Sequence, residues 1–120
     1  MNILTKYLCL ALVALVLIDF VHTYDTNEEK EKFVKMVDKL RKLYKEEKLN
    51  YENIIKKIYD CANAHIGQPG WVCDSVKDAV FDGDDAMEAI SFLMNKSSSW
   101  SMGVNDWHNC IYCFENSFGI

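Results

Sequence analysis

The chain is poor in the features that mark strands and catalytic loops. Its 120 residues include one proline, Pro69, no apolar–polar alternation of strand length and no Asn-Gly hairpin signal. The motifs G-x-S-x-G and H-E-x-x-H and a phosphate-cradling glycine loop are also missing from the sequence. These absences favour an all-α protein that is not an enzyme.

Basic residues are scarce in the second half of the chain. Residues 58–120 carry two lysines against nine acids, whereas residues 28–57 carry ten Lys or Arg against seven acids, and the net charge is −5. Because acids dilute the basic residues and the total is acidic, nucleic acid is not expected as a partner. The asymmetry predicts that a basic first half packs on an acidic second half.

One apolar run stands near the start of the chain. Lys6 precedes the run Tyr7–Ile18, which has the length of a signal-peptide core and is shorter than the roughly 20 residues of a membrane helix. We predict that residues 1–23 are a signal peptide, cleaved before Tyr24, and that residues 24–120 are one secreted, extracellular domain. An uncleaved anchor or a buried helix is the alternative. No second run of spanning length occurs, which disfavours membrane contact.

Four cysteines follow the leader, and Cys9 lies within it. An even number of cysteines in an oxidising compartment predicts two disulfides. The C-x-x-C segment places both of its thiols on one helix face, about one turn apart. We therefore expect Cys61 and Cys73 each to pair with one of Cys110 and Cys113.

The apolar periodicity predicts a bundle of four to five helices. Thr26 or Asn27 is expected to cap the first helix, and Asn50 to cap the second, which stops near Gly67. The apolar faces of these two helices are expected to comprise Phe33, Met36, Val37, Leu40, Leu43, Tyr44, Tyr51, Ile54, Ile55, Ile58, Tyr59 and Ala62.

Turn signals divide the rest of the chain. A third helix should run from the turn at residues 68–70 to residues 82–83, and Asp84 or Asp85 should cap a fourth. Residues 95–99 are expected to form an exposed polar linker, in which Asn95 begins an N-x-S acceptor for N-glycosylation. The last helix should begin between residues 101 and 105 and end in a frayed tail, residues 116–120.

Zinc binding and redox catalysis are alternatives to disulfide formation for the four cysteines. Cys61 with His65, and His108 with the C-x-x-C pair, are zinc-ligand types, but exported thiols oxidise and no second close cysteine pair is present. A redox C-x-x-C needs a helix N-terminus after a strand. The acidic segment at residues 82–85 lacks the later glycine and glutamate of a calcium loop. No metal and no cofactor are expected.

In its leader, size, helical pattern and final C-x-x-C, the chain resembles the small secreted helical carriers of insects, the chemosensory and odorant-binding proteins. Its spacing, C-x11-C-x36-C-x2-C, has a longer gap before the last pair than the chemosensory family shows. The resemblance is therefore one of architecture.

Two functional hypotheses follow. In the first, the bundle carries an apolar small molecule in its interior. In the second, the protein is a secreted effector of venom or salivary type that acts through its surface on an extracellular protein of a host or prey. The candidate lining residues of the first hypothesis are Ile55, Ile58, Tyr59, Ile90, Leu93, Met94, Trp107 and Ile111.

Overall fold

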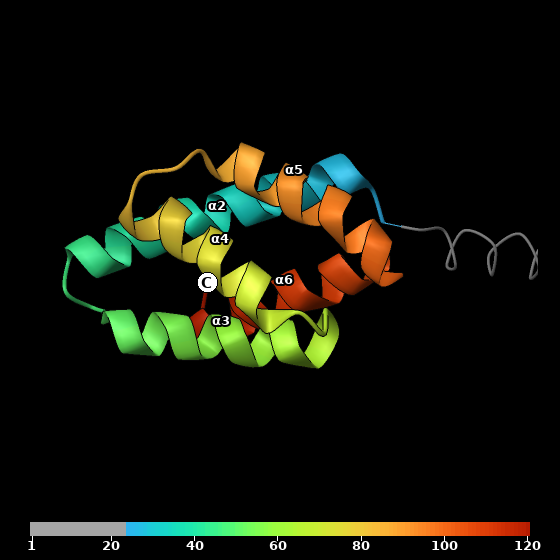
Figure 1. Ribbon diagram of the computed structural model, residues 1–120. Helices are drawn as coiled ribbons and strands as arrows, with labels where there is room; N and C mark the ends of the chain where they lie inside the picture. Colours follow the sequence, from blue (N-terminus) through green and yellow to red (C-terminus); the bar gives the residue numbers. More distant parts are fainter. Residues whose placement is uncertain (1–23) are drawn as a thin grey trace, which may run out of the picture.

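The computed structural model describes residues 24–120, which form five α-helices and one short 3-10 helix (Figure 1). The elements are α2 (Thr26–Lys45), α3 (Tyr51–His65), α4 (Pro69–Phe81), α5 (Ala86–Ser97), η1 (Ser98–Trp100) and α6 (Val104–Phe118). The predicted all-α bundle of four to five helices is confirmed. The predicted signal peptide, residues 1–23, lies outside the described part of the chain.

Side-chain caps fix the beginnings of three helices. The Asp25 carboxylate accepts the backbone N–H of Asn27 at 2.8 Å and that of Glu28 at 3.4 Å, so Asp25 caps α2. The expectation that Thr26 or Asn27 caps this helix is wrong, because a carboxylate one residue earlier already satisfies the first free amides. Asn50 caps α3 and Asp85 caps α5, as predicted.

The predicted polar linker at residues 95–99 is wrong. The helix α5 continues to Ser97, and η1 follows it directly. The hydroxyls of Ser97, Ser98 and Ser99 each donate to the carbonyl three residues earlier, at 2.6–2.8 Å, and so occupy carbonyls at the helix end. Asn95 is therefore exposed in the last turn of α5, and its glycosylation remains a prediction.

The core lies between two sets of helices that share α4 and α6. The helix α2 packs against α4, α5 and α6, while α3 packs against α4 and α6. In Figure 1, α5 and α2 form the upper part of the bundle and α3 the lower part. Phe33, Ile54, Ile58, Leu93 and other residues predicted to face inward are fully buried.

Three tyrosines that were predicted to face inward lie near the surface. Tyr44, Tyr51 and Tyr59 are 42–48% exposed. The rings of Tyr44 and Tyr51 both pack on Phe81, with centroids 4.8 Å away. A tyrosine can cover the edge of a core with its ring while its hydroxyl stays in water, which explains why periodicity overestimated the burial of these residues.

One of the two predicted disulfides is present. Cys61 of α3 is bonded to Cys113 of α6, with Cα atoms 5.7 Å apart. Within residues 24–120 the second bond is absent, and Cys73 and Cys110 are buried thiols. Burial raises the pKa of Cys73 to about 11 and also raises the pKa of Cys110, so the thiolate form that attacks in disulfide exchange is suppressed at both.

The C-terminal residues are ordered by a helix cap. Gly119 has a φ of +68°, a conformation that a glycine adopts without a Cβ clash. This turn lets the N–H of Ile120 donate to the carbonyl of Glu115 at 2.9 Å and brings Ile120 against the core. The expectation of a frayed tail from residue 116 onward is therefore wrong.

Removing the disulfide should lower the stability of the bundle strongly. The bond joins cysteines 52 residues apart in the sequence. On the chain-entropy model, replacing both Cys61 and Cys113 with Ser should lower the free energy of unfolding by about 4 kcal/mol. Urea unfolding followed by circular dichroism measures the change. The control is Ser117→Ala, which removes only the hydroxyl 3.4 Å from the Cys61 sulfur. Equal midpoints for the two variants would contradict the prediction.

Candidate functional site

The residues predicted to line an interior ligand site mostly fill the core. Ile58, Ile90, Leu93, Trp107 and Ile111 are at most 1% exposed and belong to one packed cluster. The other three residues lie further out. Ile55 and Met94 are half-buried, and Tyr59 is exposed on the outer side of α3.

Trp107 is held in the core by a short chain of hydrogen bonds. Its indole N–H donates to the hydroxyl of Ser97 at 2.9 Å, and that hydroxyl donates to the carbonyl of Met94 at 2.8 Å. Met94 and Trp107 also line an open hollow of about 130 Å³ between the end of α5 and the start of α6. This volume is less than half of the roughly 300 Å³ at which pockets that bury a drug-sized ligand begin.

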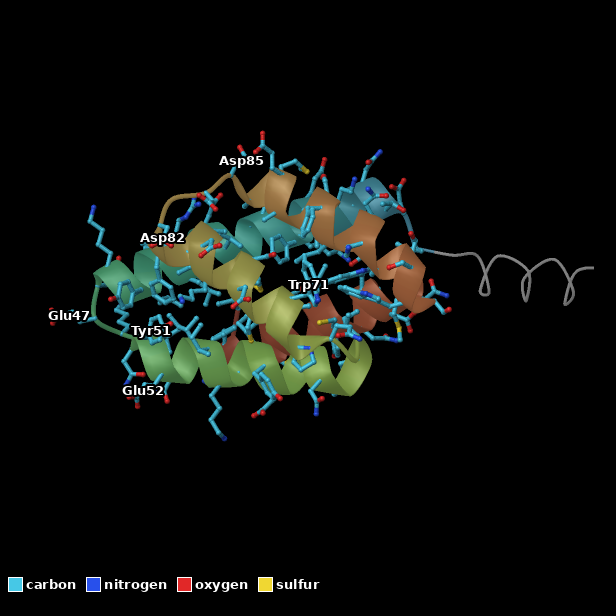
Figure 2. The ribbon with its side chains drawn as sticks, viewed as in Figure 1. Glu47, Tyr51, Glu52, Trp71, Asp82 and Asp85 are labelled. Carbon is cyan, nitrogen blue, oxygen red and sulfur yellow. A yellow bond between two sulfur atoms is a disulfide. The ribbon has the colours of Figure 1, made fainter. Side chains whose placement is uncertain are left out.

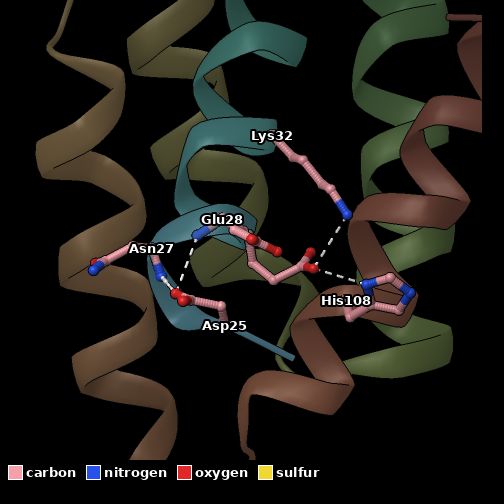
Figure 3. Close-up of polar contacts among 6 residues, drawn as sticks. Asp25, Asn27, Glu28, Lys32 and His108 are labelled. Carbon is pink, nitrogen blue, oxygen red and sulfur yellow. Dashed lines mark hydrogen bonds and ion pairs between the residues drawn. The ribbon is translucent and has the colours of Figure 1, made fainter. Parts of the chain in front are cut away.

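A buried carboxylate joins α2 to α6 (Figure 3). Glu29 is 1% exposed, and its Oε1 accepts from Nδ1 of His108 at 2.8 Å and from Nζ of Lys32 at 3.3 Å. The ring of Tyr24 stacks on the imidazole with centroids 3.5 Å apart and covers it. The second oxygen, Oε2, is buried without a hydrogen-bond partner among the described residues.

This carboxylate–imidazole pair is suited to holding two helices together. Within residues 24–120, no group of three or more His, Cys, Asp or Glu side chains could hold a metal ion. The burial of Glu29 was not predicted from the sequence. Its position, four residues before Phe33 and seven before Met36, places its carboxylate on the apolar stripe of α2 and could have indicated that it is buried.

Arg41 is a second residue that the sequence analysis missed. Its Nε donates to the carbonyl of Ala79 at 2.8 Å and its Nη2 to the carbonyl of Asp84 at 2.7 Å. These bonds fix the C-terminal end of α4 and the turn after it against α2. A cation at this end of a helix also complements the helix dipole.

Two exposed aromatic side chains and one half-buried one form a cluster that we call the aromatic face: Trp71 of α4, Phe92 of α5 and the half-buried Trp100 of η1. The ring centroid of Trp71 lies 6.0 Å from that of Phe92 and 6.2 Å from that of Trp100. Trp71 is 44% exposed and Phe92 is 50% exposed. The ammonium of Lys96 lies 5.1 Å from the Trp71 centroid, a cation–π contact.

An acidic hollow adjoins the aromatic face. It has a volume of about 380 Å³, and its lining includes Phe92 and the acids Asp78, Asp84, Asp85 and Glu88. Figure 2 shows Trp71 at the start of α4 and Asp82 and Asp85 beyond its other end. Phe92 therefore belongs both to the aromatic face and to the hollow.

One acid of this region, Asp78, has a raised pKa. Partial burial, a hydrogen bond with Asp82 and the charges of Asp82 and Asp84 raise the pKa of Asp78, and Lys77 opposes the rise. Four carboxylates lining one hollow create a negative potential there. A cation entering the hollow would relieve this repulsion.

A third feature is a groove between α2 and α6 that we call the lysine groove. Its volume is about 210 Å³, and it is lined by Lys32, Lys35, Met36, Lys39, Glu115 and Ile120. The lysines recur on one side of α2, and Met36 and Ile120 give the groove an apolar floor.

Among the helices that the structure describes, none is long and apolar enough to cross a membrane.

Comparison with known proteins gives no relative from which to transfer a function. No family model, curated protein or solved structure matches the chain.

The buried pair between α2 and α6 should contribute measurably to stability. Replacing His108 with Ala leaves the Glu29 carboxylate without its shortest partner. Because hydrogen bonds to charged groups contribute about 1.5–3 kcal/mol, the variant should lose about 2 kcal/mol of unfolding free energy at neutral pH. His108→Gln, which retains a donor, should lose less.

The control is His65→Ala in α3. His65 is half-buried and has no side-chain hydrogen bond within residues 24–120, so this change should cost about 0.5 kcal/mol or less. Chemical denaturation of all three variants measures the differences. A loss at His108 no larger than the loss at His65 would show that the pair is dispensable.

Proposed function

We propose that the chain is an exported, non-enzymatic binding protein that acts through its surface on an extracellular protein. The aromatic face is the single observation that carries this proposal. The rings of Trp71 and Phe92 lie together at the surface, and the half-buried Trp100 packs beside Trp71. Tryptophans in particular are enriched among the residues that dominate binding energies.

The charge beside the aromatic face favours a partner with a basic surface. Phe92 belongs to both the aromatic face and the acidic hollow. One segment of a partner protein can therefore contact the aromatic rings and the four acids together. Lys96 already occupies the face of Trp71, which shows that this ring accommodates an ammonium group. A lysine or arginine of the partner would meet the same ring chemistry and the carboxylates of the hollow.

The packing of the interior favours surface binding over the interior-carrier hypothesis. Five of the eight candidate lining residues are closely packed in the core. A ligand in the interior would have to displace side chains that already pack against one another, which costs free energy. The aromatic face needs no such rearrangement.

Export and a second crosslink belong to the same proposal. Cys73 of α4 and Cys110 of α6 are both buried thiols of one core cluster. In the secretory pathway, a disulfide of an oxidoreductase would accept two electrons and two protons from these thiols. A Cys73–Cys110 bond would form and the donor disulfide would be reduced to two thiols.

The thiol state of the exported protein tests this part. Protein collected from the medium of a secreting host is denatured without reduction and treated with iodoacetamide. We expect no alkylation at Cys73 or Cys110, and a peptide pair joined through these residues in mass spectrometry. Alkylation of both cysteines in protein released from such a host would contradict the second crosslink, while the Cys61–Cys113 bond serves as the internal standard.

Binding of basic peptides tests the surface function. We expect an octalysine peptide to change the fluorescence of the exposed Trp71 at low salt, and an octaglutamate peptide to have no effect. Trp71→Ala or Phe92→Ala should weaken octalysine binding about tenfold, as loss of a central aromatic contact does. Binding should weaken with added salt. The pKa of Asp78 is raised above the ordinary aspartate value of 3.8, so on acidification Asp78 loses its charge at a higher pH than an ordinary aspartate does. Octalysine binding should weaken as that charge is lost.

A matched pair of charge variants locates the site. Asp78→Asn with Glu88→Gln removes two charges from the hollow and leaves the Asp85 cap intact. Glu52→Gln with Asp60→Asn removes two charges from exposed positions of α3. The first pair should weaken binding several-fold more than the second. Equal effects of the two pairs, or equal binding of octaglutamate, would exclude this face as the site.

A further inference from the structure

The lysine groove combines an apolar floor with cations at its edge. Met36, which is 2% exposed, and the side chain of Ile120 lie at its base. Ile120 reaches the groove because Gly119 turns the chain back after α6 and the Ile120 N–H binds the Glu115 carbonyl. The apolar surface at this point is therefore fixed by a helix cap.

Two of the three lysines lack a counter-ion within the described residues. Lys32 pairs with the buried Glu29 carboxylate at 3.3 Å, whereas Lys35 and Lys39 form no ion pair with any residue from 24 to 120. They are four residues apart on one helix, so their like charges destabilise α2 slightly. Glu115, the one acidic side chain of the lining, lies across the groove on α6.

We propose that the lysine groove binds a medium-chain fatty acid, with its carboxylate between Lys35 and Lys39 and its hydrocarbon chain over Met36 and Ile120. An anion at this position neutralises the repulsion between the two lysines. A hydrocarbon chain would cover the part of Ile120 that remains exposed and so remove it from water. Glu115 disfavours a second anionic group at the far side, so a monocarboxylate fits better than a dicarboxylate.

The size of the groove favours a single acyl chain. At about 210 Å³ it is smaller than the roughly 300–1,000 Å³ that drug-sized ligands occupy, so it suits part of one acyl chain and not a two-chain lipid. This site lies on α2 and α6 and shares no residue with the aromatic face or the acidic hollow. It is therefore independent of the surface function proposed above.

Calorimetric titration of the protein recovered from a secreting host tests the inference, with decanoate as the probe below its micelle concentration. We expect saturable binding at one site. Because burial of each methylene contributes favourably, octanoate should bind several-fold more weakly, up to about tenfold. Decanol, which lacks the charge, and decylammonium, which reverses it, should bind at least about tenfold more weakly than decanoate.

Variants on the same helix separate the groove from general charge effects. Lys35→Gln with Lys39→Gln should weaken decanoate binding about tenfold, whereas Lys42→Gln with Lys45→Gln, at exposed positions outside the groove, should change it less than about twofold. Ile120→Ser alters the floor at the last residue of the chain and should weaken decanoate and decanol alike.

Three outcomes would overturn the proposal. The first is equal affinity for decanoate and decylammonium, and the second is an equal effect of the two lysine pairs. The third is decanoate binding that is unaffected by Ile120→Ser and by Lys35→Gln with Lys39→Gln, which would place the ligand elsewhere. Octalysine binding, measured on the same variants, should be unchanged, so failure of one site is distinguishable from failure of the other.

Discussion

The attachment of α6 to both α2 and α3 is the constraint on which the bundle depends. On one side the Cys61–Cys113 bond joins α6 to α3, and on the other Glu29 of α2 binds His108 of α6. Cys113 lies five residues after His108, so both attachments fall within less than two turns of α6. The buried Trp107 and Ile111 lie in the same stretch, and this part of α6 therefore positions the core between the two sets of helices.

The sequence alone was sufficient for the helices and most of their buried faces, because an apolar stripe of period 3.6 specifies both together. The predictions were wrong at helix ends, where hydrogen bonds of local polar groups determine the backbone structure. The three serines at residues 97–99 indicate a loop by composition, yet their hydroxyls bind helix carbonyls and extend the helical structure. Similarly, Gly119 indicates only that a helix stops, whereas the cap it forms also places Ile120.

The candidate surfaces were less predictable for a different reason. Trp71, Phe92 and Trp100 are far apart in the sequence, and their types suit a core as well as a surface. Only the packing of α4 against α5 and η1 brings them together and leaves Trp71 and Phe92 exposed. The charge asymmetry of the chain, by contrast, was visible in the sequence, and the structure collects it into the lysine groove of α2 and the acidic hollow of α4 and α5.

This segregation of charge has a consequence for diffusion in solution. A body with cations gathered on one helix and anions on two others has an electric dipole moment in addition to its net charge of −5. A highly charged surface approached from a distance of about a Debye length would exert a torque on such a molecule. The protein would then rotate before touching that surface, and first encounters would occur in a preferred orientation.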